Sequence, residues 1–266
     1  MSRKKREFTV DDAKAALWRQ GVLDWKLTEV QKIIKKGIFE DTNKINVVLC
    51  SRRLGKSYLM CTMALEQCLS KAGSVVKFVF PKQKDVKRNI LPLMRQILED
   101  CPEEVKPRYM EADKAMRFPH NGSEIQFAGS DSGNIEGVRG GFSHLNIFDE
   151  VGFADDVTYG IRSVLSPTTK TTGGRTILVS TPSRSENHEF ITDWVLPYQA
   201  ENRVKTFTLY DNPNFTPEII AEIIAEYPKG VDDVDFKREY LCVISRGAEN
   251  NILTSFTSEN EKFIVR

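Results

Sequence analysis

Short apolar runs rich in β-branched residues alternate along the chain with longer stretches of helical periodicity. Four of the runs predict buried strands: Ile45–Cys50, Val75–Phe80, Leu145–Phe148 and Thr176–Ser180. The first two are each followed by a predicted helix, at Lys56–Ser70 and Lys84–Glu99. This alternation predicts an α/β fold with a mostly parallel central sheet and helices on both of its faces.

The pattern changes in two regions. Two short runs within Ala115–Ala128 flank Asn121-Gly122, which favours a hairpin turn because both residues tolerate positive φ. Toward the C-terminus, Thr216-Pro217 has the features of a helix start, with the threonine as N-cap and proline at the first helical position. A small helical subdomain is therefore predicted after the sheet, with helices at Pro217–Glu226 and Val234–Tyr240.

Composition narrows the class of protein. Hydrophobic residues make up 40% of the 266 positions, which is enough for a sizeable core. No apolar run approaches the roughly 20 residues that span a bilayer, and no signal-peptide segment is present, so the chain is expected to be soluble and cytosolic. The net charge of +1 leaves any nucleic-acid binding to local basic patches. The five cysteines lack metal-site spacing and are expected to be buried thiols.

The segment Cys50–Ser57 has the features of a phosphate-binding loop. It follows a predicted strand, opens a predicted helix and ends in Gly55-Lys56-Ser57. Backbone N–H groups at such a helix start cradle phosphate oxygens, while the lysine reaches the β- and γ-phosphates and the serine hydroxyl ligates Mg²⁺. Cys50 stands where the usual first glycine would be. A helix that merely begins with Gly-Lys-Ser is therefore the alternative for this motif taken alone.

A second motif is the strand end Phe148-Asp149-Glu150. In phosphate-loop enzymes a strand-end aspartate holds the magnesium shell, and an adjacent glutamate is suited to polarise the water that attacks the γ-phosphate. The alternative is an acidic strand end that caps the next helix. Because the predicted strand Val75–Phe80 lies between the two motifs in sequence, the chain fits the ASCE type of P-loop NTPase, which has an additional strand and a catalytic glutamate. The glutamate favours ATP hydrolysis over phosphoryl transfer to a small acceptor.

Ser180 and Thr181 end the fourth predicted strand and precede Pro182. At this place after the acidic strand, their hydroxyls are suited to sense the γ-phosphate and to relay its loss. Taken alone, the segment would be interpreted as a strand that ends at a proline turn.

In this order, the three motifs resemble those of the large terminase subunits of tailed double-stranded DNA viruses, in their ATPase domain. Four segments carry the resemblance: Ser51–Ser57 as an arginine-bearing phosphate loop, Ile135–Gly141 as the glycine-rich arginine segment, Ser180–Pro182 as the coupling motif, and Phe236–Tyr240 as the end of the lid subdomain. The resemblance covers roughly Trp25 to Ile244.

The resemblance implies roles for the matched residues. The nucleotide-binding positions are Ser51, Arg52, Arg53, Leu54, Gly55, Lys56, Ser57 and Gln31, the last matching a glutamine that contacts adenine. Lys56 would bind the phosphates, and Ser57 and Asp149 would bind Mg²⁺. Glu150 would be the catalytic base. Arg139 matches the arginine finger that one subunit supplies to its neighbour's ATP. The alternatives are a surface-loop arginine and an ordinary helix glutamine.

The resemblance also implies an organisation and partners. The chain divides into an N-terminal arm (1–24), a P-loop ATPase core (25–197), a lid subdomain (198–249) and a tail or linker (250–266). After Tyr240 there is no room for the family's nuclease domain, so none is expected in this chain. The expected cofactors are ATP and Mg²⁺, and the expected partners are double-stranded DNA, a portal protein and a small terminase subunit.

The implied motor is a homo-oligomeric ring that translocates DNA into a procapsid, with a monomer expected in dilute solution. It would work in the host cytoplasm, docked transiently on the procapsid and absent from the mature virion. Lys84, Lys87 and Arg88 are candidates for contacts with DNA phosphates. A solvated charged helix face is the alternative for them.

Three other functions stay open. A helicase-type DNA translocase would unwind strands, a P-loop small-molecule kinase would transfer phosphate to a metabolite, and a nucleotide switch would prefer GTP. The segment Asn43–Asn46 superficially resembles a guanine motif, but it precedes the phosphate loop and lacks the terminal aspartate.

Overall fold

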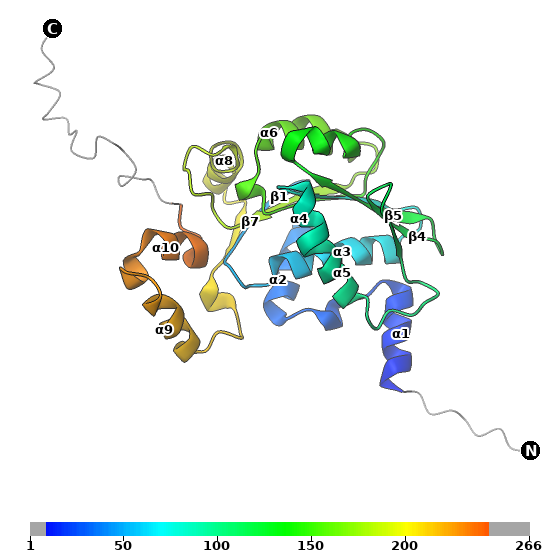
Figure 1. Ribbon diagram of the computed structural model, residues 1–266, viewed down its shortest axis with the longest axis horizontal. Coiled ribbons are helices and arrows are strands. Elements are labelled where there is room, and N and C mark those ends of the chain that lie inside the picture. The colour runs from blue at the N-terminus through cyan, green and yellow to red at the C-terminus, as the bar shows by residue number, and fades with distance from the viewer. Residues whose placement is uncertain (1–8, 245–266) are drawn as a thin grey trace, which may run out of the picture.

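Eight strands form one sheet within residues 9–244, the part of the chain that the computed structural model describes (Figure 1). The strands lie in the order β3-β4-β5-β2-β6-β7-β1-β8. Their bounds are β1 Ile45–Cys50, β2 Val75–Phe80, β3 Arg108–Met110, β4 Ala115–Phe118, β5 Ser123–Gly129, β6 Leu145–Asp149, β7 Arg175–Ser180 and β8 Val204–Phe207.

The sheet is parallel from β5 to β8, and β3 and β4 add an antiparallel edge. The change of direction follows from the turn at Asn121-Gly122, where Gly122 has a φ of 73° that a side chain would strain. Helices or longer segments connect the parallel strands. The predicted α/β class, the mostly parallel sheet, the hairpin and the four predicted strands are therefore confirmed.

Helices cover both faces of the sheet, with α6 and α8 on one side and α1, α2, α3 and α5 on the other (Figure 1). The second side carries α1 Val10–Gln20, α2 Glu29–Glu40, α3 Lys56–Ser70, and one continuous helix made of α4 Gln83–Asp85, a π-helical segment Val86–Ile90 and α5 Leu91–Ile97. The first side carries α6 Val157–Tyr159, a π-helical segment Gly160–Leu165, α7 Ser166–Thr168, a π-helical segment Phe190–Val195 and α8 Leu196–Ala200. Between residues 9 and 244, none of the helices has the length and apolar character needed to cross a membrane.

The first helix belongs to the packed core. Thr9 caps α1 by accepting from the N–H of Asp12, and Thr28 caps α2 in the same way from Gln31. Trp18 of α1 is fully buried and shares one apolar cluster with residues of α2 and α3. Trp18 thus attaches α1 to the core, within the segment that the sequence analysis assigns to an N-terminal arm.

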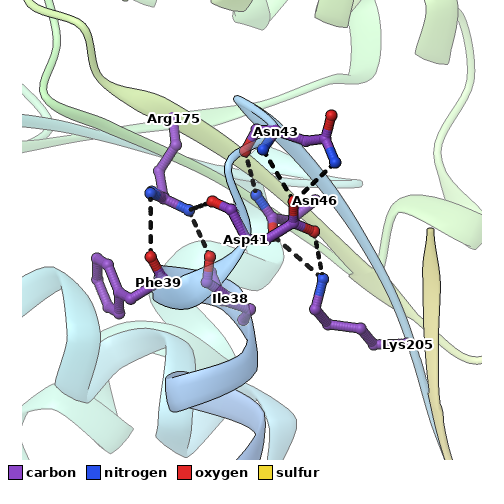
Figure 2. Close-up of polar contacts among 7 residues, drawn as sticks. All are labelled: Ile38, Phe39, Asp41, Asn43, Asn46, Arg175 and Lys205. Carbon is purple, nitrogen blue, oxygen red and sulfur yellow. Dashed lines mark hydrogen bonds and ion pairs between the residues drawn. The ribbon is translucent and has the colours of Figure 1, made fainter.

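A polar network ties the end of α2 to the amino ends of β7 and β8 (Figure 2). The Arg175 guanidinium donates to three carbonyls at the C-terminus of α2, those of Ile38, Phe39 and Asp41. It thereby satisfies acceptors that the helix leaves open and places positive charge at the negative end of the helix dipole. The Lys205 ammonium lies 2.6 Å from the Asp41 carboxylate. Both contacts fix α2 against the strands.

A small apolar cluster follows the sheet at the β8 edge. Helices α9 Pro217–Ala225 and α10 Val234–Leu241 pack around Leu209, Phe236 and Tyr240, and Figure 1 shows them beyond that end of the sheet. The helix starts as predicted, with Thr216 as N-cap of α9. Strand β8 lies inside the segment assigned to the lid subdomain, so the sheet extends further than that boundary. A lid role for the cluster stays a prediction, and the tail at 250–266 lies outside the described residues.

Candidate active site

The three sequence motifs meet at one edge of the sheet because of the strand order. Strand β7 lies between β1 and β6, where Ser180 pairs with Leu49 and Val179 pairs with Asp149. The three strands are parallel, so the segments that follow them leave the sheet at the same edge. The phosphate loop, the acidic pair and the hydroxyl pair therefore lie around one site.

The loop between β1 and α3 presents backbone N–H groups rather than side chains. Gly55 has a φ of 81° and Arg53 a φ of 59°, so both lie in the left-handed region. Leu54 is buried and anchors the loop to the core. Within the described residues, no N–H group from Arg53 to Ser57 donates to a backbone carbonyl. Such groups at the start of a 15-residue helix form an anion site suited to phosphate.

The end of β8 and helix α10 hold this loop from behind. The Ser51 N–H donates to the carbonyl of Phe207 at 2.9 Å, and the Arg52 N–H donates to the carbonyl of Glu239 at 2.9 Å. The Arg52 guanidinium also lies 3.7 Å from the Glu239 carboxylate, and the side chain of Arg53 is exposed. The phosphate loop is therefore bonded directly to the end of α10.

Gln31 packs under the phosphate loop. Its side-chain N–H donates to the Gly55 carbonyl at 3.1 Å, and its side-chain oxygen accepts from the Thr28 N–H at 2.9 Å. The side chain is buried, and a Cβ added at Gly55 would lie 2.4 Å from its nitrogen. The structure thus places Gln31 at the site, where it ties the start of α2 to the loop. Its expected contact with adenine stays a prediction.

A lysine and a glutamate from two of the motifs form an ion pair. The Lys56 Nζ lies 3.2 Å from Oε1 of Glu150, and the lysine side chain is buried. Burial alone would lower the pKa of the Lys56 ammonium, but Glu150 and Asp149 raise it above its usual value. The lysine is therefore positively charged, and a carboxylate stands beside the place where it would meet phosphate.

Asp149 has the features of a magnesium ligand. It is fully buried, and burial together with the Glu150 charge raises the pKa of its carboxyl to about 7. One carboxylate oxygen accepts from the Glu150 N–H at 2.9 Å, while the other is buried without a hydrogen-bond partner in the described chain. The Ser57 hydroxyl lies close enough to lower this pKa. A carboxylate with an open oxygen beside a hydroxyl fits Mg²⁺, which takes few protein ligands besides phosphates and water.

The backbone turns sharply at the second carboxylate. Glu150 has a φ of 55° and a ψ of 34°, a left-handed conformation that is strained for a residue with a side chain. The bond from its N–H to Asp149 stabilises this turn. The turn sends the two neighbouring carboxylates to different places, since Asp149 is fully buried whereas the Glu150 side chain is 25% exposed.

Two hydroxyls at and just beyond the end of β7 form hydrogen bonds with Gly152, just after Glu150. The Ser180 hydroxyl accepts from the Gly152 N–H at 3.1 Å, and the Ser183 hydroxyl donates to the Gly152 carbonyl at 2.7 Å. Ser180 and Thr181 are both buried. The Ser180 hydroxyl therefore connects the predicted coupling motif to the segment that carries the glutamate, and the Ser183 hydroxyl just beyond the motif adds a second bond.

Gly152→Ala is expected to destabilise the protein and to lower its ATPase activity. A Cβ at this position would lie 2.8 Å from the Ser180 hydroxyl and 2.8 Å from the Thr181 carbonyl. Relief of this overlap moves one of the two segments, which costs about 1–3 kcal/mol. Thermal unfolding would measure the loss. Gly37→Ala is the matched control, because Gly37 lies within α2, a Cβ there would meet only side-chain carbons of Lys205 at 3.5 and 3.7 Å, and alanine favours a helix. An unfolding midpoint equal to that of wild type would show that Gly152 is not tightly packed against Ser180 and Thr181.

Arg139 lies on the surface of the molecule. It follows a 3₁₀ segment, Asp131–Val138, and its guanidinium contacts the Glu136 carboxylate at 3.1 Å and the Tyr159 hydroxyl at 3.2 Å. The side chain is 55% exposed. In the described part of the chain it forms no hydrogen bond or ion pair with Lys56, Glu150 or the other motif residues.

The three basic residues proposed for DNA lie on the α4–α5 helix and are exposed. Lys84 is in α4, whereas Lys87 and Arg88 are in the π-helical segment, where the spacing of side chains departs from that of an α-helix. Lys87 forms an ion pair with Glu111. The Glu111 carboxylate therefore lowers the net positive charge of this surface, although an exposed pair of this kind is weak.

Several residues at the site were missed by sequence reasoning. The Asn212 side chain donates to the Arg53 carbonyl at 3.0 Å, and Glu239 contacts Arg52. Ser183 lies two residues beyond the predicted hydroxyl pair, so its closeness to that pair in the sequence was a signal that could have found it. Asn212 precedes α9 and Glu239 lies in α10, and nothing in their local sequence indicates a contact with the phosphate loop.

The sequence matches a family model over residues 47–256, described as the N-terminal region of the terminase large subunit of T4likevirus type. The matched range contains the phosphate loop, the acidic pair and the hydroxyl pair, so the resemblance predicted from the motifs is confirmed. No curated protein sequence matches the chain.

Solved structures of phage proteins share the fold. The large terminase of a thermophilic bacteriophage in complex with ADP has a TM-score of 0.63 and 14% identity, over 82% of this chain and 53% of that one. The Thermus phage P74-26 large terminase ATPase domain has a TM-score of 0.59 and 16% identity, over 91% and 100%. The bacteriophage HK97 large terminase has a TM-score of 0.65 and 14% identity, over 88% and 55%. This chain thus spans about half the length of the first and third.

Proposed function

We infer the function from one premise, that this chain belongs to the N-terminal family of T4likevirus-type terminase large subunits. We propose that it is the ATP-hydrolysing motor domain that translocates double-stranded DNA into a procapsid. The observation that carries the proposal is the carboxylate of Glu150, 3.2 Å from the lysine of a phosphate loop. A base in that place acts on a water next to the γ-phosphate.

Each group of the site has a role in this proposal. The N–H groups of the loop and the Lys56 ammonium bind the phosphates, and the Glu150 carboxylate takes the proton of the attacking water. Ser57 and Asp149 would hold Mg²⁺, which bridges phosphate oxygens and neutralises their charge. The buried, unpartnered oxygen of Asp149 supports this assignment.

The coupling of hydrolysis to movement would run through two contacts. Ser180 bonds to Gly152, so a change at the γ-phosphate that moves Glu150 is transmitted to β7. The bonds from Ser51 and Arg52 to Phe207 and Glu239 would transmit this movement to the end of β8 and to α10, with the helices α9 and α10 acting as a lid. The exposed surface carrying Lys84 and Arg88 would meet DNA phosphates.

The motor would be assembled from several copies. Arg139 is exposed and pairs with Glu136 rather than with a group of the site in its own chain, which supports a role as an arginine finger for a neighbouring subunit in a ring. The chain would be monomeric when dilute. A portal protein and a small terminase subunit are the proposed partners, in the host cytoplasm and at the procapsid.

Steady-state release of inorganic phosphate, measured against protein concentration with and without double-stranded DNA, tests the proposal. The rate per subunit should rise with concentration, because each finger acts only when subunits meet, and DNA should raise it further. Lys56→Ala sets the background. A total rate strictly proportional to protein concentration would exclude an arginine finger that acts in trans. Phosphate found on an organic acceptor instead of in solution would establish a kinase.

A further inference from the structure

A buried lysine holds the segment that carries Arg139. Lys77 is in the middle of β2, paired with Gln126 of β5 and Asn146 of β6, and its side chain is 1% exposed. Its Nζ donates to the Val138 carbonyl at 2.6 Å and to the Gly140 carbonyl at 2.6 Å. These two peptide groups lie on either side of Arg139.

The electrostatics of this lysine are costly for the fold. Burial lowers the pKa of its ammonium to about 8, and the Glu124 carboxylate on β5 offsets only part of the effect. It forms no ion pair with a carboxylate among the described residues, and peptide carbonyls are its acceptors. An apolar side chain of similar length would avoid this desolvation penalty. The charged ammonium therefore serves to hold two carbonyl groups in place rather than to stabilise the fold.

Other restraints on the segment are the buried side chain of Val138 and the surface contacts of the Arg139 guanidinium with Glu136 and Tyr159. The Arg139 N–H donates to the Glu136 carbonyl at 3.0 Å. The next two residues, Gly140 and Gly141, have φ values of 80° and 62°, are exposed, and leave open space where a Cβ would be. A glycine pair of this kind is permissive, so the direction in which Arg139 leaves the surface depends on the bonds that precede and follow it. Lys77 makes two of them from a central strand.

We propose that Lys77 is a positioning residue for Arg139: its buried ammonium fixes the two flanking carbonyls and so sets the position of the backbone from which the guanidinium extends. The proposal rests on the proposed function, in which that guanidinium reaches a neighbouring subunit's ATP. A displacement of about 1 Å in a group of this kind lowers turnover by about 10²-fold, although the residue that causes it touches no substrate.

The test compares Lys77→Met with Lys44→Met. Lys44 also donates to a loop carbonyl, that of Gly173 at 2.8 Å, but it is exposed and far along the chain from Arg139. Hydrogen exchange of the Arg139 and Ser143 amides reports anchoring directly, because these N–H groups donate to the carbonyls of Glu136 and Thr168. Lys77→Met should speed this exchange about tenfold or more, and Lys44→Met should leave it unchanged. Equal exchange in Lys77→Met and wild type overturns the proposal.

Activity supplies the second readout. Lys77→Met should bind a fluorescent ATP analogue as wild type does, while its turnover at assembling concentrations falls by about 10–10²-fold. In the Arg139→Ala background the same substitution should change turnover by less than about twofold, because the two residues act as one unit. An additive loss there overturns the positioning role.

The two proposals fail differently. If Arg139→Ala alone keeps full turnover, the assignment of Arg139 as an arginine finger fails. The exchange experiment still decides whether Lys77 anchors the segment. Should Lys77→Met not fold, Lys77→Gln removes the charge but keeps a side-chain donor. Its exchange and its double-variant turnover are then judged by the same two criteria.

Discussion

Glu150→Gln should abolish most ATP hydrolysis while leaving ATP binding intact. Positioned general bases contribute about 10²–10⁴-fold to rate, and an amide cannot accept the proton of the attacking water. The carboxylate is 3.2 Å from Lys56, next to the proposed phosphate site, so its negative charge opposes the binding of ATP. The variant should therefore bind ATP as tightly as wild type or more tightly.

Glutamine suits this test because it preserves the local geometry. Glu150 has a left-handed backbone stabilised by the bond from its N–H to Asp149, and neither feature requires a charge. The amide oxygen can still accept from Lys56. A loss of turnover without a loss of folding then reports the chemistry of the carboxylate.

Single-turnover phosphate release and equilibrium binding of an ATP analogue would separate the two effects. Asp155→Asn is the matched control, since it removes one negative charge from an exposed position five residues along the chain. Turnover within about threefold of wild type in Glu150→Gln would be far from the effect expected of a general base. The catalytic assignment would then fail.

Residues with local signals were predictable from the sequence. Lys56, Ser57 and Asp149 stand at the junctions of strongly patterned strands and helices, where strand ends and loop glycines predict a phosphate site. The helix predicted at Lys56–Ser70 has those bounds in the structure. The strand order also follows from the motifs once the type of P-loop protein is recognised.

The rest depends on tertiary contacts that leave little trace in the chain. Strand β3 has three residues, and β8 is half polar, so neither shows a clear pattern. The π-helical segment at 86–90 alters side-chain spacing that an α-helical pattern would assume. Lys77 had a signal, a lone charge inside an apolar strand, which indicates a buried partner but not which one. Its partners are carbonyls 61 and 63 positions away.

Arg139→Ala should lower turnover by about 10³–10⁵-fold, the effect of an arginine that stabilises transition-state charge on a transferring phosphoryl group. In the structure this arginine contacts Glu136 and Tyr159 on the surface. Exposed pairs of this kind contribute little stability, about 0–1 kcal/mol, so releasing the arginine from them is easy. The alanine variant should fold and bind ATP normally.

Mixing Arg139→Ala with Glu150→Gln distinguishes a finger in trans from one in cis. Each protein alone should be nearly inactive, one for want of the finger and the other for want of the base. In a mixed ring, an Arg139→Ala subunit keeps its own glutamate and meets the arginine of a Glu150→Gln neighbour, so activity should return and depend on the mixing ratio. A finger acting in cis would leave every subunit defective, and the mixture would stay as inactive as its components. Mixing each variant with Lys56→Ala extends the test, since only the pair with Arg139→Ala should then recover activity.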